Sequence, residues 1–171
     1  MSAVRKFAVP ERQPGEAERR AAVEAYGLSR PQADAELDAL VAEAAGAFAV
    51  PTAMISVGYG RRQLFPVRFG FDAASVPRAV AFCGHAAGPD PLVVPDTSAD
   101  VRFAGNPLVI ARDGVRFYAG APLMTPDGHS IGTLCLIDSK ARRPLSADER
   151  ARLQAMADRV IERLEARRAN P

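Results

Sequence analysis

The chain has few of the residues on which several classes of protein depend. Its 171 residues include only two cysteines and two histidines. Cys83 and Cys135 are too few for a disulfide framework and form no C-x-x-C motif, so we expect free thiols in a reducing compartment. No stretch reaches the roughly eighteen apolar residues of a membrane-spanning helix, and residues 1–16 hold no apolar run of secretory length. These absences predict a cytoplasmic protein without a membrane partner.

The chain also has little excess of positive over negative charge, because the formal net charge is only +2. Lys6 and Lys140 are the only lysines, and the arginines are spread through every segment, mostly beside Asp and Glu. A nucleic-acid-binding protein usually gathers its basic residues on one face, with aromatic residues between them. We therefore expect no nucleic-acid partner.

The order of periodic segments predicts an α+β fold, with two helices, then strands, then a long helix. Residues 15–26 form an amphipathic helix that ends at a glycine, and a second helix follows Pro31. At this length one compact core is expected. We predict a flexible N-terminal segment at residues 1–14, a single domain at residues 15–168, and a tail at residues 169–171.

Short runs rich in β-branched and apolar residues predict five strands. They are residues 52–58, 62–70, 91–96, 114–124 and 129–138. Pro66 indicates that the second strand lies towards a sheet edge, because proline cannot donate to a ladder. The turn TPDG joins the last two strands into the strongest hairpin of the chain.

The last helix has the clearest start signal, since Ser146 and Glu149 have the spacing of a capping box. It is predicted to run to about Arg168. Four apolar positions along it alternate four and three apart: Leu153, Ala157, Val160 and Leu164. Such a seam either packs on the sheet of its own chain or pairs with a second protomer.

The stretch VAFCGHAAG places Cys83 two residues before His85. A metal site needs three or four ligands, and Cys83 and His85 do not share one helical face, so we expect no metal. A thiolate nucleophile needs a base within reach, which His85 provides in principle. The alternative is that Cys83 packs with Phe82 as an inert small hydrophobe of the core.

The segment from Asp96 to Gly120 mixes charged and apolar side chains. Asn106 before Pro107 is a helix cap, and a short helix at residues 108–112 would offer its N-terminus to an anion. The alternative is that Asn106 only caps and that Asp100 pairs with Arg102.

In the strand that follows, Arg116, Tyr118 and Gly120 share one face, because side chains alternate along a strand. Hydrogen-bond donors next to the space left by the missing side chain of Gly120 are typical of the floor of a ligand pocket. The alternative is a sheet face exposed to solvent, which has the same pattern.

These elements and strings together resemble the GAF domain, a small-molecule sensory fold of bacterial signalling proteins. The match runs from about Arg19 to Leu164. It is carried by YGL, VPTAMISV, PRAVAFCGHA, LVVPDTSADVRFAGNPLV, VRFYAGAPL and GTLCLID, in this order. The resemblance implies a PAS-related fold with a central antiparallel sheet of five to six strands. N- and C-terminal helices would pack on one face, and a ligand pocket would lie on the other.

The resemblance also implies which residues face the ligand. They are Phe82, Cys83, His85, Asp96, Arg102, Phe103, Asn106, Arg116 and Tyr118. Relatives are fused to histidine kinases or cyclic-di-nucleotide enzymes, whereas this chain stops after its last helix, so any output domain would be a separate signalling protein. We expect a homodimer through the N- and C-terminal helices, and the sequence does not identify a ligand or cofactor.

Three chemistries of the family can be compared with these residues. Bilin-binding relatives attach the pigment through a cysteine beside a histidine beyond the third strand, and residues 96–120 contain neither. Free methionine-R-sulfoxide reductases are similar around Cys83 but need a further cysteine within residues 96–116, where there is none. Cyclic-nucleotide binding has no short motif to test. We therefore expect a non-catalytic sensor of a small molecule, with a Cys83-dependent reductase and a ligand-free dimerisation module as alternatives.

Overall fold

Six antiparallel strands form one sheet through the middle of the molecule. The computed structural model describes residues 6–86 and 88–170, and the strand order is β3-β2-β1-β6-β5-β4. The strands are β1 (Thr52–Tyr59), β2 (Arg62–Phe69), β3 (Ser75–Pro77), β4 (Leu92–Val94), β5 (Phe117–Met124) and β6 (Ser130–Asp138). The predicted α+β class and sheet of five to six strands are confirmed. The predicted flexibility of residues 1–14 and the predicted tail stay predictions, and residues 1–5 and 171 lie outside the described residues.

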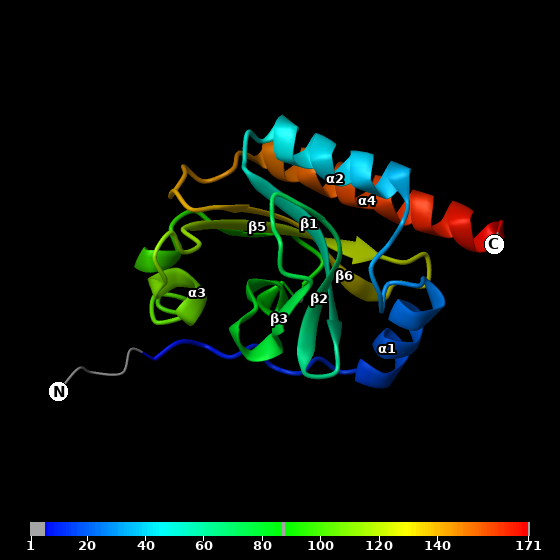
Figure 1. Cartoon of the computed structure of the whole chain (residues 1–171), viewed down its shortest axis with the longest axis horizontal. Helices are drawn as coiled ribbons and strands as arrows, with labels where there is room; N and C mark the ends of the chain where they lie inside the picture. The colour runs from blue at the N-terminus through cyan, green and yellow to red at the C-terminus, as the bar shows by residue number, and fades with distance from the viewer. Residues whose placement is uncertain (1–5, 87, 171) are drawn as a thin grey trace.

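Two long helices, α2 (Ala35–Ala47) and α4 (Ala147–Ala169), lie side by side on one face of this sheet, and short helices cover the other (Figure 1). The remaining long helix, α1 (Glu16–Ala25), lies apart from them and contacts β1 and β6, and its Val23 packs in the same core as α2 and α4. The short helices are η1 (Arg78–Val80), η2 (Phe82–His85), η3 (Thr97–Ala99) and α3 (Pro107–Ile110). We call the described residues of segment 78–116 the loop layer. The sheet therefore separates two apolar cores.

Local signals in the sequence set the helix ends. The Asp34 carboxylate accepts the backbone N–H groups of Glu36 and Leu37 at 3.0 and 3.1 Å and so begins α2. Ser146 and Glu149 form both hydrogen bonds of the predicted capping box at the start of α4. These caps satisfy backbone donors that the first helical turn leaves without partners.

The expectation that Pro66 places β2 towards a sheet edge is confirmed at the proline itself, although β2 as a whole lies between β1 and the short edge strand β3. Strand β3 pairs only with residues 62–64, so Pro66 lies beyond this neighbour. On the other side, the ladder with β1 is irregular between Ile55 and Val57. Proline fits here because no regular ladder needs its missing N–H.

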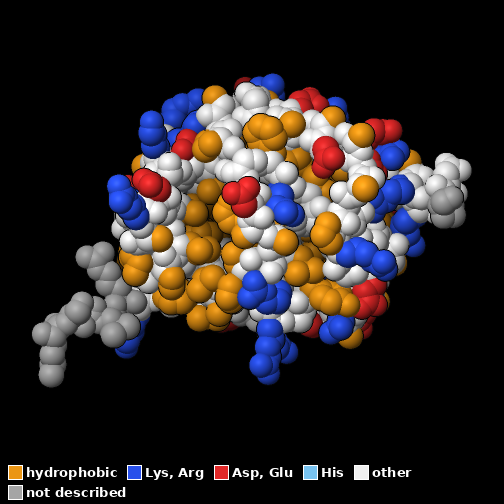
Figure 2. Space-filling view, in the orientation of Figure 1, with side chains coloured by type: hydrophobic (Ala, Val, Ile, Leu, Met, Phe, Trp, Pro, Cys, Tyr) orange, Lys and Arg blue, Asp and Glu red, His pale blue; other side chains and the backbone are white. Residues whose placement is uncertain are grey.

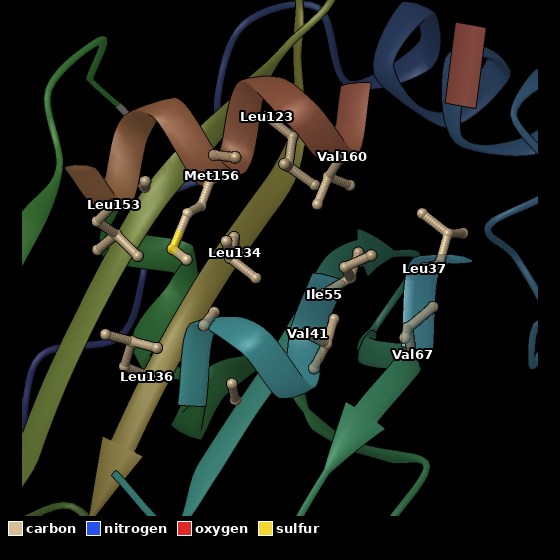
Figure 3. Packing of buried hydrophobic residues seen from close by; sticks show 14 of the residues in the cluster. Leu37, Val41, Ile55, Val67, Leu123, Leu134, Leu136, Leu153, Met156 and Val160 are labelled. Carbon is tan, nitrogen blue, oxygen red and sulfur yellow. The ribbon is translucent and has the colours of Figure 1, made fainter. Parts of the chain in front are cut away.

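The heptad residues of α4 belong to the core on the long-helix face. Leu153, Ala157, Val160 and Leu164 are all 0% exposed. Figure 3 shows Leu153, Met156 and Val160 directed towards the sheet residues Leu123 and Leu134. Complete burial of such a side chain contributes about 1.5–3 kcal/mol. The seam therefore packs within its own chain, and any dimer must use other residues.

The visible surface carries no large area of one charge. Figure 2 shows arginine and lysine side chains scattered over this face with acidic side chains between them. Several ion pairs hold these charges, among them Arg159 with Glu43 at 2.8 Å between α4 and α2. This distribution matches the pattern read from the sequence.

Candidate functional site

Aromatic side chains join the loop layer to the sheet. The Phe82 ring of η2 stacks on Tyr118 of β5, with 5.6 Å between the centroids, and lies 5.0 Å from the Phe103 ring. The His85 ring meets Phe103 edge-on at 4.9 Å. Phe82, Phe103 and Tyr118 are at most 3% exposed, so they fill much of the space that the sequence assigned to a ligand.

An apolar cavity of about 50 Å³ remains between this aromatic group and the sheet. Its lining comes from β1, β2, β3, β5, β6, the connection between β2 and β3, and the loop layer. The lining residues are Met54, Phe65, Phe71, Val76, Ala81, Phe82, Cys83, Leu108, Val115, Tyr118 and Ile137. Because this volume equals that of only about four water molecules, a bound molecule of more than a few heavy atoms requires the loop layer to move.

A polar cavity of about 60 Å³ lies on the other side of Cys83. Its lining residues are Gln13, Arg19, Gly58, Gln63, Arg78, Cys83, Gly84, Ala86, Ser130, Ile131, Gly132 and Thr133. The Arg78 guanidinium forms a two-bond ion pair with Glu16, the first residue of α1, and one of these bonds measures 3.1 Å. Hydrogen bonding to Arg78 holds the pKa of Glu16 below its ordinary value. The Arg78 guanidinium of this cavity is therefore already paired with the Glu16 carboxylate.

Cys83 separates the two cavities, and its Sγ lies 3.6 Å from the Sγ of Cys135. The buried hydroxyls of Tyr118 and Thr133 have no hydrogen-bond partner among the described residues. Burial raises the pKa of the Cys83 thiol, but the polar groups around it, led by the Cys135 thiol, lower it, and the lowering is the larger effect. Burial, followed by the effect of Cys83, raises the pKa of Cys135 well above its ordinary value. The pKa of Cys83 is therefore lowered and the pKa of Cys135 raised relative to an ordinary thiol.

His85 does not act on this thiol in the structure. The described residues contain no hydrogen bond between His85 and Cys83, and the imidazole lies against Phe103. Burial, and then the charge of Arg102, lowers the pKa of His85 and keeps the ring neutral near pH 7. The two residues lie in η2, which is a single 3-10 turn.

The four predicted polar residues of the loop layer form hydrogen bonds within that layer. Asp96 caps η3, and Arg102 pairs with the Asp100 carboxylate at 2.7 Å. Asn106 caps α3 and donates its amide N–H to the Val80 carbonyl at 3.0 Å. Arg116 donates to the backbone carbonyl of Val109.

Of the nine predicted residues, Phe82, Cys83 and Tyr118 line the apolar cavity, and Phe103 packs against Phe82. Direct contact with a ligand stays a prediction for all nine.

Several residues of this site were absent from the set read from the sequence, notably Thr133 and Arg78, which line the polar cavity, and Cys135, which contacts Cys83. Thr133 and Cys135 alternate on β6 and therefore face the same side. This alternation was a readable signal, but only the pairing of β6 with β1 and β5 places that side under the loop layer. Arg78 had no local signal, because its partner Glu16 is 62 residues away.

Metal ligands are not grouped in the described part of the chain. Within residues 6–86 and 88–170 no three His, Cys, Asp or Glu side chains are close enough to hold one ion. In the same residues no helix combines the length and apolar character needed to cross a membrane.

The fold and the order of motifs identify the class of this protein. Residues 32–164 match the GAF domain family, and the chain belongs to that family. Membership supports a sensory or regulatory role.

Comparison with characterised proteins gives one extended sequence match and many similar structures. The chain is 37% identical over 159 residues to a cyclic di-GMP phosphodiesterase of Pseudomonas aeruginosa, covering 92% of this chain and 27% of that enzyme. The chain thus spans about a quarter of the length of this curated relative.

Two solved structures illustrate the shared fold. The GAF domain of the Acinetobacter phosphoenolpyruvate-protein phosphotransferase has a TM-score of 0.64 at 17% identity, over 94% of this chain and 98% of that one. The free methionine-R-sulfoxide reductase of Neisseria meningitidis has a TM-score of 0.63 at 18% identity, over 98% and 99% of the two chains. At these identities the likeness shows the fold alone.

Proposed function

We propose that this chain is a non-catalytic regulatory GAF domain that binds a small amphipathic molecule beneath the loop layer. The observation that carries the proposal is the meeting of an apolar and a polar cavity at Cys83. A molecule with a hydrocarbon body and a polar or anionic end matches these two surfaces. The domain would act in the cytoplasm on a signalling enzyme, and its similarity to a cyclic di-GMP phosphodiesterase supports this role.

The ion pair between Arg78 and Glu16 offers a route from the ligand to a terminal helix. An anionic ligand group in the polar cavity would compete with the Glu16 carboxylate for the Arg78 guanidinium. Release of Glu16 would loosen the first turn of α1. Binding then shifts the position of α1 only as far as the ligand prefers one state over the other.

Native mass spectrometry of the purified protein tests for a co-purified ligand, and an amphipathic anion, anilinonaphthalene sulfonate, provides a binding probe. Arg78→Gln should weaken probe binding severalfold, because the cavity loses one of its two guanidinium groups. Arg61→Gln, an exposed neighbour, is the matched control. Ala81→Leu fills the apolar cavity and should also reduce binding. Unchanged binding by both site variants would refute the assignment.

A second candidate function is a thiol-dependent reductase of free methionine-R-sulfoxide that uses Cys83. The proximity of Cys135 favours it, because a second thiol lies 3.6 Å away. The absence of a cysteine from residues 96–116 opposes it, since similar reductases use one there. We expect no loss of methionine sulfoxide in the presence of dithiothreitol. Repeated turnover that Cys83→Ser abolishes would establish the reductase instead.

We also propose a homodimer through the terminal helices, using the outer surface between α2 and α4. Leu40 and Ala166 line a groove there, between the ion pairs of Arg159 and Arg163. Sedimentation velocity measures the dimer directly. Leu40→Glu should shift the chain to a monomer, and a variant that keeps the wild-type mass would exclude this surface.

A further inference from the structure

Cys83 and Cys135 have the geometry of a thiol pair that can close into a disulfide. The two residues are 52 positions apart, yet η2 and β6 bring their Sγ atoms to 3.6 Å. A disulfide requires about 2.05 Å, so the two sulfurs together must approach by about 1.5 Å. Cys83 lies in a single 3-10 turn, and rotation about its side-chain bond with a small shift of η2 can supply this movement.

Two unpartnered hydroxyl groups beside the pair point to a thiolate. Tyr118 is 0% exposed and Thr133 is 3% exposed, and neither hydroxyl has a hydrogen-bond partner among residues 6–86 and 88–170. A buried donor without an acceptor is costly, and native structures rarely leave one. Thr133 lines the polar cavity together with Cys83, and Tyr118 lines the apolar cavity together with Cys83. A deprotonated Cys83 sulfur supplies the acceptor that each hydroxyl lacks.

The two thiols differ in access, which assigns their order of reaction. Cys83 is half-buried and lines the polar cavity beside Gln13 and Arg78, whereas Cys135 is 0% exposed. The Cys135 thiol also donates to the Met54 carbonyl at 3.6 Å, which keeps its proton in place. A small oxidant entering the polar cavity therefore meets Cys83 first.

We propose that Cys83 and Cys135 form a hydroperoxide-oxidisable pair, with Cys83 as the attacking thiol and Cys135 as the resolving thiol. The Cys83 thiolate attacks one peroxide oxygen. A sulfur–oxygen bond forms, the oxygen–oxygen bond breaks, and the leaving oxygen departs as hydroxide or alkoxide that takes up a proton. The Cys135 sulfur then attacks the Cys83 sulfenic acid. A disulfide forms, and the Cys135 proton and the sulfenic hydroxyl leave as water.

The reaction consumes two thiols and one hydroperoxide and yields one disulfide, one water and one further water or alcohol. This oxidation is a single event per chain and needs no bound ligand. The disulfide would bind η2 covalently to β6 and so fix the loop layer on the sheet.

Mass spectrometry of the intact 171-residue chain after exposure to hydrogen peroxide tests the proposal. We expect a loss of two hydrogens, a Cys83–Cys135 cross-linked peptide after digestion, and full reversal by dithiothreitol. Cys135→Ser should instead accumulate a sulfenic acid on Cys83 that dimedone traps. Cys83→Ser should leave Cys135 unmodified under the same conditions.

The rate of Cys83 alkylation distinguishes a reactive thiolate from a thiol that merely lies close to Cys135. Thr133→Val removes a hydroxyl beside the sulfur and should slow iodoacetamide modification of Cys83 at pH 7 by about threefold to tenfold. Thr125→Val, in the turn between β5 and β6, is the matched control with the wild-type rate. An unchanged mass after peroxide, equal dimedone labelling of both cysteines, or disulfides only between chains would overturn the proposal. Because the wild-type measurements need no variant, a misfolded variant does not prevent the test.

Discussion

The hydroxyl of Tyr118 occupies the space above Gly120, so that a β-carbon added to Gly120 would overlap the Tyr118 oxygen. The two residues are on the same face of β5, and Gly120 pairs with Cys135 of β6. The gap that the sequence offered to a ligand is therefore filled by a side chain of the protein. Glycine is required here for the close approach of the phenol and not for an unusual backbone angle.

Gly120→Ala should lower the free energy of unfolding by about 1–3 kcal/mol, because the new methyl group overpacks the site. In a Tyr118→Phe background the loss should be smaller but not absent, since the ring carbon Cζ would still lie 2.8 Å away. Urea denaturation of the wild type, the two single variants and the double variant measures the coupling between the two positions. Gly46→Ala in α2 is the control and should stabilise by about 0.5–1 kcal/mol, because its methyl group meets no atom. Additive losses would contradict the overlap.

Asp34→Asn should lower the free energy of unfolding at pH 7 by about 1–3 kcal/mol, because asparagine still caps α2 but no longer pairs with Arg163 and Arg167. Burial raises the pKa of Asp34, yet hydrogen bonds from the Leu37 N–H and Arg163 lower it below its ordinary value. The stabilisation is therefore present above the unfolded pKa of about 3.9 and is lost as pH falls through the folded pKa.

Urea denaturation from pH 7 to pH 3 checks this prediction. The wild-type chain should lose the extra stability at the acid end, whereas Asp34→Asn should not. Asp38→Asn, an exposed neighbour on α2, is the control and should behave as the wild type. Equal acid sensitivity of all three proteins would contradict the role of the Asp34 charge.

His85→Gln should make the fold less sensitive to mild acid. The folded pKa of His85 lies below its unfolded value of about 6.5, so the neutral ring favours the folded state above this pH. That stability is lost as pH falls through the folded pKa. Thermal unfolding between pH 7 and pH 5 measures how steeply the stability of the fold changes with pH. His129→Gln, exposed beside the hairpin turn, should keep the wild-type slope.

Leu164→Ala should lower the free energy of unfolding by about 2–5 kcal/mol without changing the mass measured by sedimentation, because Leu164 packs in its own chain. Leu40→Ala, in the groove between α2 and α4, should have a smaller effect on unfolding. Dissociation of a dimer by Leu164→Ala, with folding intact, would show that the seam joins two chains.

Asn106→Ala should loosen the loop layer, because the side chain both caps α3 and holds the Val80 carbonyl. The loss of a helix cap and of a buried hydrogen bond together should lower the free energy of unfolding by about 1–3 kcal/mol. Hydrogen exchange should accelerate in η1 and α3 more than in β5. Asn170→Ala at the exposed C-terminal end of α4 is the control. Uniform protection across the three segments would contradict this role.

The elements that depend on neighbours in sequence were readable from the chain. The capping box of Ser146 and Glu149 and the hairpin around residues 125–128 involve residues at most a few positions apart. The alternation along β6 likewise placed Thr133 and Cys135 on one face, although it did not say which layer covers that face.

Features of the site that join distant segments could not be read in this way. The contact between Cys83 and Cys135 depends on η2 resting on β6, and the pairing of Arg78 with Glu16 depends on where α1 meets η1. The sequence motif had coupled Cys83 to His85, but the turn of η2 directs their side chains to different neighbours.

By itself, the sequence determined the α+β class, the family, and the order and approximate ends of the helices and strands, because caps, turns and side-chain periodicity act over a few residues. Only the tertiary structure decided that the seam of α4 is internal, that Tyr118 fills the gap at Gly120, and that two thiols meet. Each of these depends on which faces pack together, and that choice is made by burial of apolar surface across the whole chain.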